Sequence, residues 1–345
     1  MRLKDVCNVF LDGDWIENKD QSPAGIRLIQ TGNIGNGIFL EKKERARFIS
    51  EETFARLKCN EIFPGDILVS RLPDPIGRAC IIPDTDERMI TAVDCTICRV
   101  DKSMILPEFL CYFMRSAMYC NAIMENVTGT TRKRISRKNL GNVNVRLFPL
   151  DDQQAIVHKL DYITKIIKLR KKELAQLDYL IKARFVELFG DPVLNDKKFL
   201  TVLGDSFFKL SNGKAVSEKK RYKAGIPAYG GNGISCFTDK PLIADDTLVV
   251  GRVGFQSGNV HYAEGPLWIT DNAMYISKYD KDKFNLMFLC DLMQHIDFSR
   301  FQDAGDLKKI TQKPFMNFRY ILPSMALQQQ FVDFKRQVDK SKVVA

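Results

Sequence analysis

One long stretch of the chain carries a helical pattern of apolar positions. From Asp151 to Phe189 there is no glycine or proline, and apolar residues recur at alternating steps of four and three. This heptad spacing predicts a single helix, roughly 55 Å long, with an apolar seam along one side. Asp151 and Asp152 place acids at the positive end of the helix, and Gly190-Asp191-Pro192 predicts its end.

A helix of this length with one apolar seam needs a partner in water. A second helix with the same spacing is predicted from Gln328 to Ala345, and we expect the two to pair as an antiparallel coiled coil. The second pattern stops without a capping signal, which favours a truncated second helix. The expected pairing positions are Ile156, Leu160, Ile163, Ile167, Leu174, Leu177, Ile181, Phe331, Phe334 and Val338.

The chain also contains a long internal repeat. Five blocks recur in the same order at an offset of about 180 residues. The run Gly65-Asp66-Ile67-Leu68-Val69 recurs as Asp245-Asp246-Thr247-Leu248-Val249, and Phe148-Pro149 before Gln153-Gln154 recurs as Leu322-Pro323 before Gln328-Gln329. An ordered set of matches indicates two copies of one unit.

Each copy mixes predicted strands and helices. Short apolar runs such as Asp66 to Ser70 and Thr247 to Val250 lie between turn signals and predict strands, whereas Pro107 to Tyr119 and Leu286 to His295 predict helices. The expected fold class is mixed α/β: two similar α/β domains separated by long α-helices that form the coiled coil. The predicted boundaries are 1–150, 151–190, 191–323 and 324–345.

Charge favours a polyanionic partner. The 52 basic and 42 acidic residues give a net charge of +10, although charge alone does not separate DNA, RNA and an anionic membrane. The sequence has no apolar run of the ~18 residues that span a bilayer and no apolar leader after Met1, so we expect a cytoplasmic protein without a membrane segment. Nine scattered cysteines favour reduced core thiols over disulfides.

The densest basic cluster runs from Arg132 to Lys138 and follows the flexible Thr128-Gly129-Thr130. Cations on such a loop can approach phosphates closely. The alternative is a solvated basic turn, but Lys308, Lys309 and Lys313 follow Gly305 at the matching place of the second copy, which favours phosphate or groove contact.

Single arginines and amides are candidates for contacts with bases. The forked guanidinium group of an arginine can donate two hydrogen bonds to the edge of a guanine. An equally favoured alternative is an arginine at the end of a strand that is bonded to a nearby acid. Amides in glycine-rich turns could read adenine, although local turn bonding is the stronger reading for any one of them. The complete set of candidate DNA contacts is Arg71, Arg78, Thr130, Arg132, Lys133, Arg134, Arg137, Lys138, Tyr229, Asn232, Arg252, Lys308, Lys309 and Lys313.

Catalytic and metal signals are weak. The sequence lacks the Asn-Pro-Pro-Tyr and Asp-Pro-Pro-Tyr motifs of adenine methyltransferases and the glycine-rich loops that bind nucleotides. The three histidines are widely separated, and the Cys95 to Cys98 spacing has no second pair, so apolar packing in a strand explains it better than zinc. We assign no catalytic residue, no metal ligand and no cofactor to this chain.

The sequence resembles the specificity subunit of type I restriction-modification systems. The resemblance covers essentially the whole chain and rests on the order of its motifs, among them the runs 26–34, 65–70, 149–157, 187–192 and 226–234. It implies two target-recognition domains that each read one half of a bipartite site in double-stranded DNA. It also implies that the helices set the spacing and dock two methyltransferase subunits.

The resemblance places the chemistry in partner subunits. Methyltransferase subunits would use S-adenosylmethionine to form N6-methyladenine, and restriction or translocase subunits would use ATP and magnesium. Family members usually complete the second helix, and this chain does not. Two rival functions stay open: the recognition part of a self-contained DNA methyltransferase or nuclease, which the missing motifs disfavour, and a basic coiled-coil interaction protein, which the paired basic loops disfavour.

Overall fold

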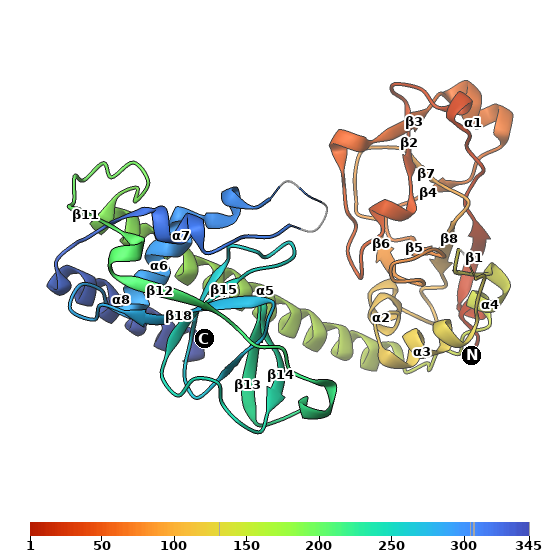
Figure 1. Cartoon of the computed structure of the whole chain (residues 1–345). Coiled ribbons are helices and arrows are strands. Elements are labelled where there is room, and N and C mark those ends of the chain that lie inside the picture. The colour runs from red at the N-terminus through yellow and green to blue at the C-terminus, as the bar shows by residue number, and fades with distance from the viewer. Residues whose placement is uncertain (131, 304, 306–307, 345) are drawn as a thin grey trace. The chain divides into compact units, whose positions relative to one another are not determined.

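The computed structural model describes residues 1–130, 132–303, 305 and 308–344 (Figure 1). The chain divides into two compact units, Met1–Lys168 and Leu169–Ala345. Helix α5 (Leu150–Phe189) contributes residues to both units. Both units are mixed α/β, as the turn-bounded apolar runs predict.

The first unit contains two four-stranded sheets and a two-stranded ladder. The sheets have the strand orders β1-β8-β5-β6 and β3-β2-β7-β4. The first sheet is antiparallel throughout, whereas β2 and β7 run parallel in the second. The strands are β1 (Cys7–Asp12), β2 (Ile26–Ile29), β3 (Arg47–Ile49), β4 (Glu61–Ile62), β5 (Ile67–Ser70), β6 (Ala79–Ile81), β7 (Met89–Thr91), β8 (Cys95–Val100), β9 (Val127–Thr128) and β10 (Arg134–Ile135), and the helices are α1 (Glu51–Leu57), α2 (Pro107–Phe113), α3 (Ala117–Glu125) and α4 (Arg137–Gly141).

The second unit repeats most of this topology and adds a two-stranded sheet of β11 and β19. Its four-stranded sheet has the order β12-β18-β15-β16, and a smaller sheet pairs β13 with β14 and, in parallel, with β17. The strands are β11 (Thr201–Leu203), β12 (Phe208–Asn212), β13 (Ile226–Gly230), β14 (Gly233–Thr238), β15 (Thr247–Gly251), β16 (Val260–Ala263), β17 (Trp268–Ile269), β18 (Ala273–Tyr279) and β19 (Arg319–Ile321), and the helices are α6 (Leu286–Ile296), α7 (Lys313–Asn317) and α8 (Met325–Val344). The matching strand orders confirm the repeat predicted from the sequence.

A buried glutamine near the start of each long helix makes the same bonds in both units. Gln153 Oε1 accepts from the backbone N–H of Leu106 at 2.9 Å, and its amide donates to the carbonyls of Met104 and Phe148. Gln328 accepts from Asn285 at 2.9 Å and donates to the carbonyls of Lys283 and Pro323. Each glutamine thus joins its helix to the loop before α2 or α6.

Helix α8 packs antiparallel against the C-terminal part of α5 within the second unit. The ring of Phe331 lies 5.5 Å from that of Phe185, and Lys342 Nζ lies 2.7 Å from Asp178 Oδ1. Residues later in α8 therefore contact residues earlier in α5, as expected for an antiparallel pair. The pairing positions that join this aromatic core are Leu177, Ile181, Phe331, Phe334 and Val338.

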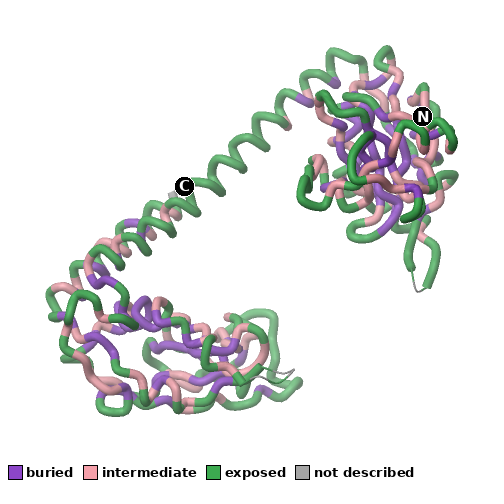
Figure 2. The backbone as a smooth tube through the Cα atoms, turned by 90° about the horizontal axis from the view of Figure 1, so that it is seen from above, coloured by how far each residue is buried: buried purple, intermediate pink, exposed green. Residues whose placement is uncertain are grey.

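The predicted pairing along the rest of the seam does not form within the described chain. Ile156 packs instead on the core of the first unit, and Leu160 is half-buried. Ile163 and Ile167 are each 50% exposed and Leu174 is 36% exposed, as Figure 2 shows for the middle of α5. The reason is length: α8 has 20 residues and α5 has 40.

The helix predicted from Pro107 to Tyr119 is two helices, which corrects the sequence interpretation. Helix α2 ends at Phe113, and Ser116 begins α3 by accepting a hydrogen bond from the backbone of Tyr119 at 3.2 Å. The serine cap explains the break, because it satisfies an N–H that a continuous helix would not leave free.

Six of the nine cysteines are buried. Cys95 and Cys98 lie fully buried in β8 with free thiols, as predicted, and burial raises the pKa of Cys95 to about 11. Among the described residues, no cluster of three or more histidines, cysteines or acids could hold a metal ion. No described helix combines the length and apolar character needed to cross a membrane.

Candidate nucleic-acid interface

The basic cluster of the first unit sits on a short hairpin. Strands β9 and β10 pair Thr128 with Arg134 and Val127 with Ile135, so Gly129, the exposed Thr130, Arg132 and Lys133 belong to the hairpin loop. Ile135 is buried, and its backbone N–H donates to the carbonyl of Arg71 at 3.2 Å. The loop is therefore anchored at its base, while Arg132 and Lys133 stay exposed at its tip.

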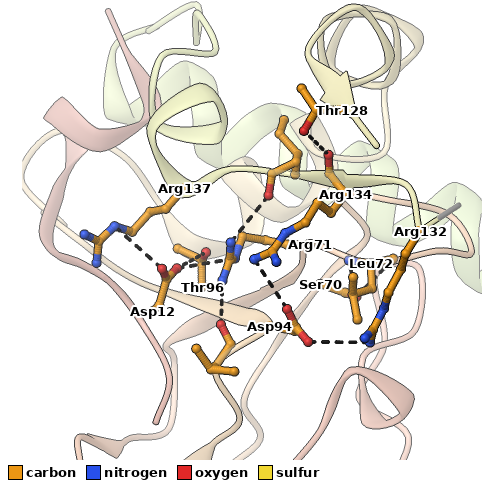
Figure 3. Close-up of polar contacts among 12 residues, drawn as sticks. Asp12, Ser70, Arg71, Leu72, Asp94, Thr96, Thr128, Arg132, Arg134 and Arg137 are labelled. Carbon is orange, nitrogen blue, oxygen red and sulfur yellow. Dashed lines mark hydrogen bonds and ion pairs between the residues drawn. The ribbon is translucent and has the colours of Figure 1, made fainter. Parts of the chain in front are cut away.

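Two acids lie near the arginines of this cluster. Arg132 and Arg134 each place a guanidinium nitrogen 3.7 Å from a carboxylate oxygen of Asp94, and Arg137 lies 3.9 Å from Asp12 (Figure 3). The arginine side chains are 73%, 50% and 47% exposed. Exposed pairs at such distances contribute at most about 1 kcal/mol. Phosphates can therefore compete for these cations at little cost.

A shallow cleft continues the basic surface around the start of α4. Ser136 caps this helix by accepting from Asn139 at 3.1 Å, so Arg137 and Lys138 lie in its first turn. They line a cleft of about 760 Å³ together with Arg2 and Lys4. The sequence reading missed Arg2 and Lys4, whose closeness to the cluster arises from tertiary structure alone.

Arg71 and Arg78 occupy structural positions. Arg71 is 3% exposed, donates to the carbonyl of Val93 at 2.6 Å and lies 3.4 Å from Asp12. Arg78 donates to four backbone carbonyls at 2.7 to 3.0 Å, among them that of Thr31. Presenting either guanidinium to a base would break these bonds. The geometry therefore favours the alternative interpretation, in which both arginines have internal partners.

The second unit brings its basic residues to the same corner of the fold. The backbone N–H of Ile310 donates to the carbonyl of Arg252 at 3.0 Å, which repeats the bond between Ile135 and Arg71. Gly254 donates to the carbonyl of Lys308 at 2.8 Å, so Lys308 and Lys309 lie beside the hairpin between β15 and β16. Arg252 itself is half-buried at the end of β15.

A cleft of about 580 Å³ opens next to this hairpin. Asn232 lies on its edge, and Arg221, Gln256 and Asn272 supply further polar side chains. Phe255 also lines the cleft and was not identified from the sequence, although its place in a glycine-flanked turn was a usable signal.

Two other predicted contacts of the second unit lie elsewhere. Tyr229 is half-buried and packs on a small apolar core that includes Val249 and Ile269. Lys313 begins α7 and lines a separate hollow with Phe301 and Asp303. The structure thus gathers Asn232, Lys308 and Lys309 near one hairpin, but does not bring Lys313 to the same cleft.

Matched positions of the two units carry different chemistry. Asp94 and Asn272 accept the equivalent backbone bonds from Arg71 and Arg252, at 2.9 and 3.0 Å. The ion pair of Arg137 with Asp12 corresponds to a hydrogen bond of 3.3 Å from Gln312 to Asn212. One scaffold therefore presents charged groups in the first unit and amides in the second.

Comparison with known proteins places the whole chain in one family. The family model described as "Type I restriction modification DNA specificity domain" matches residues 1–179 and 201–343. A putative type I restriction enzyme MjaX specificity subunit from Methanocaldococcus jannaschii is 23% identical, over 98% of this chain and 85% of the relative. The type I restriction enzyme MjaVIII specificity subunit of the same organism is 25% identical over 52% of this chain and 42% of its own length.

Solved structures share the fold. The S subunit of a type I restriction-modification system from M. genitalium superposes with a TM-score of 0.61 at 15% identity, covering 99% of this chain and 89% of that one. A chain from a structural study of complex assembly and conformational transition in the type I R-M system gives 0.58 at 16% identity, with 100% and 90% covered.

Four observations lead to one conclusion. The chain has two copies of one α/β unit, a long helix between them and basic loops at matched corners, and the family model covers both copies. This chain belongs to the type I restriction-modification DNA specificity family and is a specificity subunit with two target-recognition domains.

Proposed function

We propose that each unit reads one half of a bipartite site in double-stranded DNA, with the loop after β9 and the loop before α7 facing the duplex. The single observation that carries this is the repeated anchor, Ile135 to Arg71 and Ile310 to Arg252, which fixes a basic loop at the same corner of both units. Because the surrounding side chains differ, the two half-sites should differ in sequence.

In the first unit, Arg132, Lys133, Arg134, Arg137 and Lys138 would bind phosphates. The pairs of Arg132, Arg134 and Arg137 with Asp94 and Asp12 are weak, so these guanidinium groups remain free to bind phosphates. In the second unit, Lys308 and Lys309 would do the same, and the amides of Asn232, Gln256 and Asn272 would face base edges. Amide groups can both donate and accept, which suits the adenine edge.

We further propose that the chain acts without an active site of its own. Supporting this, the methyltransferase and nucleotide-binding motifs are missing from the sequence. Two methyltransferase subunits with S-adenosylmethionine would modify adenine, and restriction or translocase subunits with ATP and magnesium would complete a cytoplasmic complex. The exposed middle of α5 is available to contact such a partner.

Methylation mapping tests the reading of two half-sites. A genome that carries this chain with its modification subunits should acquire N6-methyladenine in a bipartite motif with an unread gap. A continuous motif, or methylation that is unaffected by deleting this chain, would contradict the proposal.

The basic loop is tested by changing Arg132, Lys133 and Arg134 to alanine together. We expect weaker binding to a duplex containing the mapped site, and a salt dependence reduced by about 2 to 3 in the slope of log K against log [salt], because up to three phosphate contacts are lost. Replacing Lys165, Lys168 and Lys171, which are exposed on α5, removes the same charge and is the matched control. Equal effects of both triple variants would show a general charge effect rather than a local contact.

A further inference from the structure

Phe255 is the most exposed aromatic side chain among the described residues. Its relative exposure is 82%, against 73% for Tyr179 and 70% for Trp15. It lies at the tip of the hairpin between β15 and β16. A phenyl group has no polar atom to compensate for contact with water, so covering a ring this exposed with a partner is favourable.

The backbone around Phe255 is held by bonds to two other segments. Gly254 donates to the carbonyl of Lys308 at 2.8 Å, and the side-chain amide of Gln302 donates to the carbonyls of Phe255 and Ser257 at 3.4 and 2.5 Å. Gly258 closes the turn by donating to Gly251 at 2.8 Å. The ring is therefore presented on an anchored turn, which lowers the entropy lost when it inserts into a partner.

The groups around the ring match nucleic acid. Lys308 Nζ lies 5.6 Å from the ring centroid, and the adjoining cleft is lined by Arg221 and the amides of Asn232, Gln256 and Asn272. Cations suit phosphates and amides suit base edges, whereas the ring itself can make only apolar or stacking contacts. A protein hot spot would instead be expected within a larger apolar patch.

We propose that Phe255 is a wedge that inserts between adjacent base pairs within the half-site read by the second unit. Base steps that unstack easily, such as pyrimidine–purine steps, would then be preferred through the energy of deforming DNA. The inference rests on the proposed function. It applies to one half-site only, because the matched hairpin tip of the first unit is Pro73-Asp74-Pro75, and the following Ile76 packs on the core.

The test uses the full chain and a duplex containing the mapped bipartite site. Wild-type protein should make thymines at one step of one half-site reactive to permanganate. Phe255→Ala should abolish that reactivity and weaken binding about 10- to 100-fold, the range for loss of one stacked aromatic, with an unchanged salt slope because no charge is removed. Phe255→Leu should retain much of both, since leucine also serves as a wedge. Trp15→Ala, an exposed aromatic of the first unit, is the matched control and should change neither.

The outcomes separate this inference from the function on which it rests. A wild-type protein that binds the mapped duplex without any unstacked step, or a Phe255→Ala variant with wild-type affinity and reactivity, would overturn the wedge and leave the function intact. A wild-type protein without preference for that duplex would overturn both. If Phe255→Ala instead left DNA binding intact but weakened assembly with the modification subunits, the ring would be a protein contact and the wedge would be wrong.

Discussion

At the scale of single residues, burial decides what an arginine does. Arg71 and Arg132 belong to the same corner of the first unit, and both approach an acid. Arg71 is enclosed and bonded to carbonyls, whereas the side chain of Arg132 is 73% exposed and lies 3.7 Å from Asp94. Arg71 should therefore contribute mainly to stability, and Arg132 mainly to DNA binding.

We expect Arg71→Ala to lower the free energy of unfolding of the first unit by about 2 to 4 kcal/mol, because buried carbonyls and Asp12 lose their donor. Arg132→Ala should change it by no more than about 0.5 kcal/mol while weakening DNA binding. Urea unfolding and duplex titration measure the two effects. An equal loss of stability in both variants would refute this division of roles.

His295 should make the second unit sensitive to mild acid. Its ring stacks on Phe185 with centroids 3.8 Å apart, and burial lowers its pKa below the ordinary 6.5. The folded state therefore binds this proton less readily than the unfolded chain does. The contribution of His295 to the stability of the fold is therefore present above the pKa of this histidine in the unfolded chain. It is lost as the pH falls below that pKa.

His261, Asp291, Lys182 and Lys335 line the same pocket as His295, and their charges also affect the pH dependence. Burial also lowers the pKa of His261, which acts in the same direction, and raises that of Asp291 despite Lys335 at 2.6 Å, which acts in the opposite direction. When the pH is lowered from about 7.5 to about 5.5, the melting temperature of His295→Phe should fall less than that of the wild type. His158→Gln, exposed on α5, is the control. An unchanged pH dependence in His295→Phe would exclude His295 as the sensor.

At the scale of elements, the two units are best matched where a glutamine joins a helix to a loop. Gln153 and Gln328 are fully buried and make equivalent sets of three bonds. Both copies keep the paired glutamines that the sequence repeat contains, but only the fold shows that the first of each pair is buried while Gln154 is exposed.

We expect Gln153→Leu to destabilise the first unit by about 2 to 4 kcal/mol, because one N–H and two carbonyls lose their partner inside the protein. Gln328→Leu should have the same effect in the second unit. Gln154→Leu removes the same group from an exposed position and should be nearly neutral. Thermal melting of the three variants decides the matter, and a comparable loss in Gln154→Leu would contradict the assignment.

At the scale of the whole molecule, duplication followed by divergence accounts for the different surfaces. The strand order of the larger sheet and the anchors are the same in both copies, while the acids of one are amides in the other. Helix α5 is a continuous element that contributes residues to both units. Its length is therefore the feature expected to determine the distance between half-sites.

Deleting residues 163–169, which are exposed, should shorten the unread gap of the methylated motif. Seven residues correspond to about 10 Å of helix, or about 3 base pairs of DNA, and the helical phase changes by only ~20°. Methylation mapping should show unchanged half-sites with a shorter gap. Replacing Ile163 and Ile167 by glutamate without a deletion is the control for loss of the apolar face. An unchanged gap after the deletion would refute the role of α5 as a spacer.

The sequence by itself determined the duplication, the long helix and the places of the basic loops, because periodicity and repeated blocks are local patterns along the chain. Only the tertiary structure decided that Arg71 is buried and that Arg78 is bonded to backbone carbonyls. It also decided that Arg2 and Lys4 join the basic surface, that α8 covers only part of the seam, and that Phe255 is exposed. Burial depends on which distant segments pack against a residue. Arg71 contacts the carbonyls of Val93 and Ile135, which lie in distant segments of the chain. No local pattern in the sequence indicates that these segments lie close to Arg71.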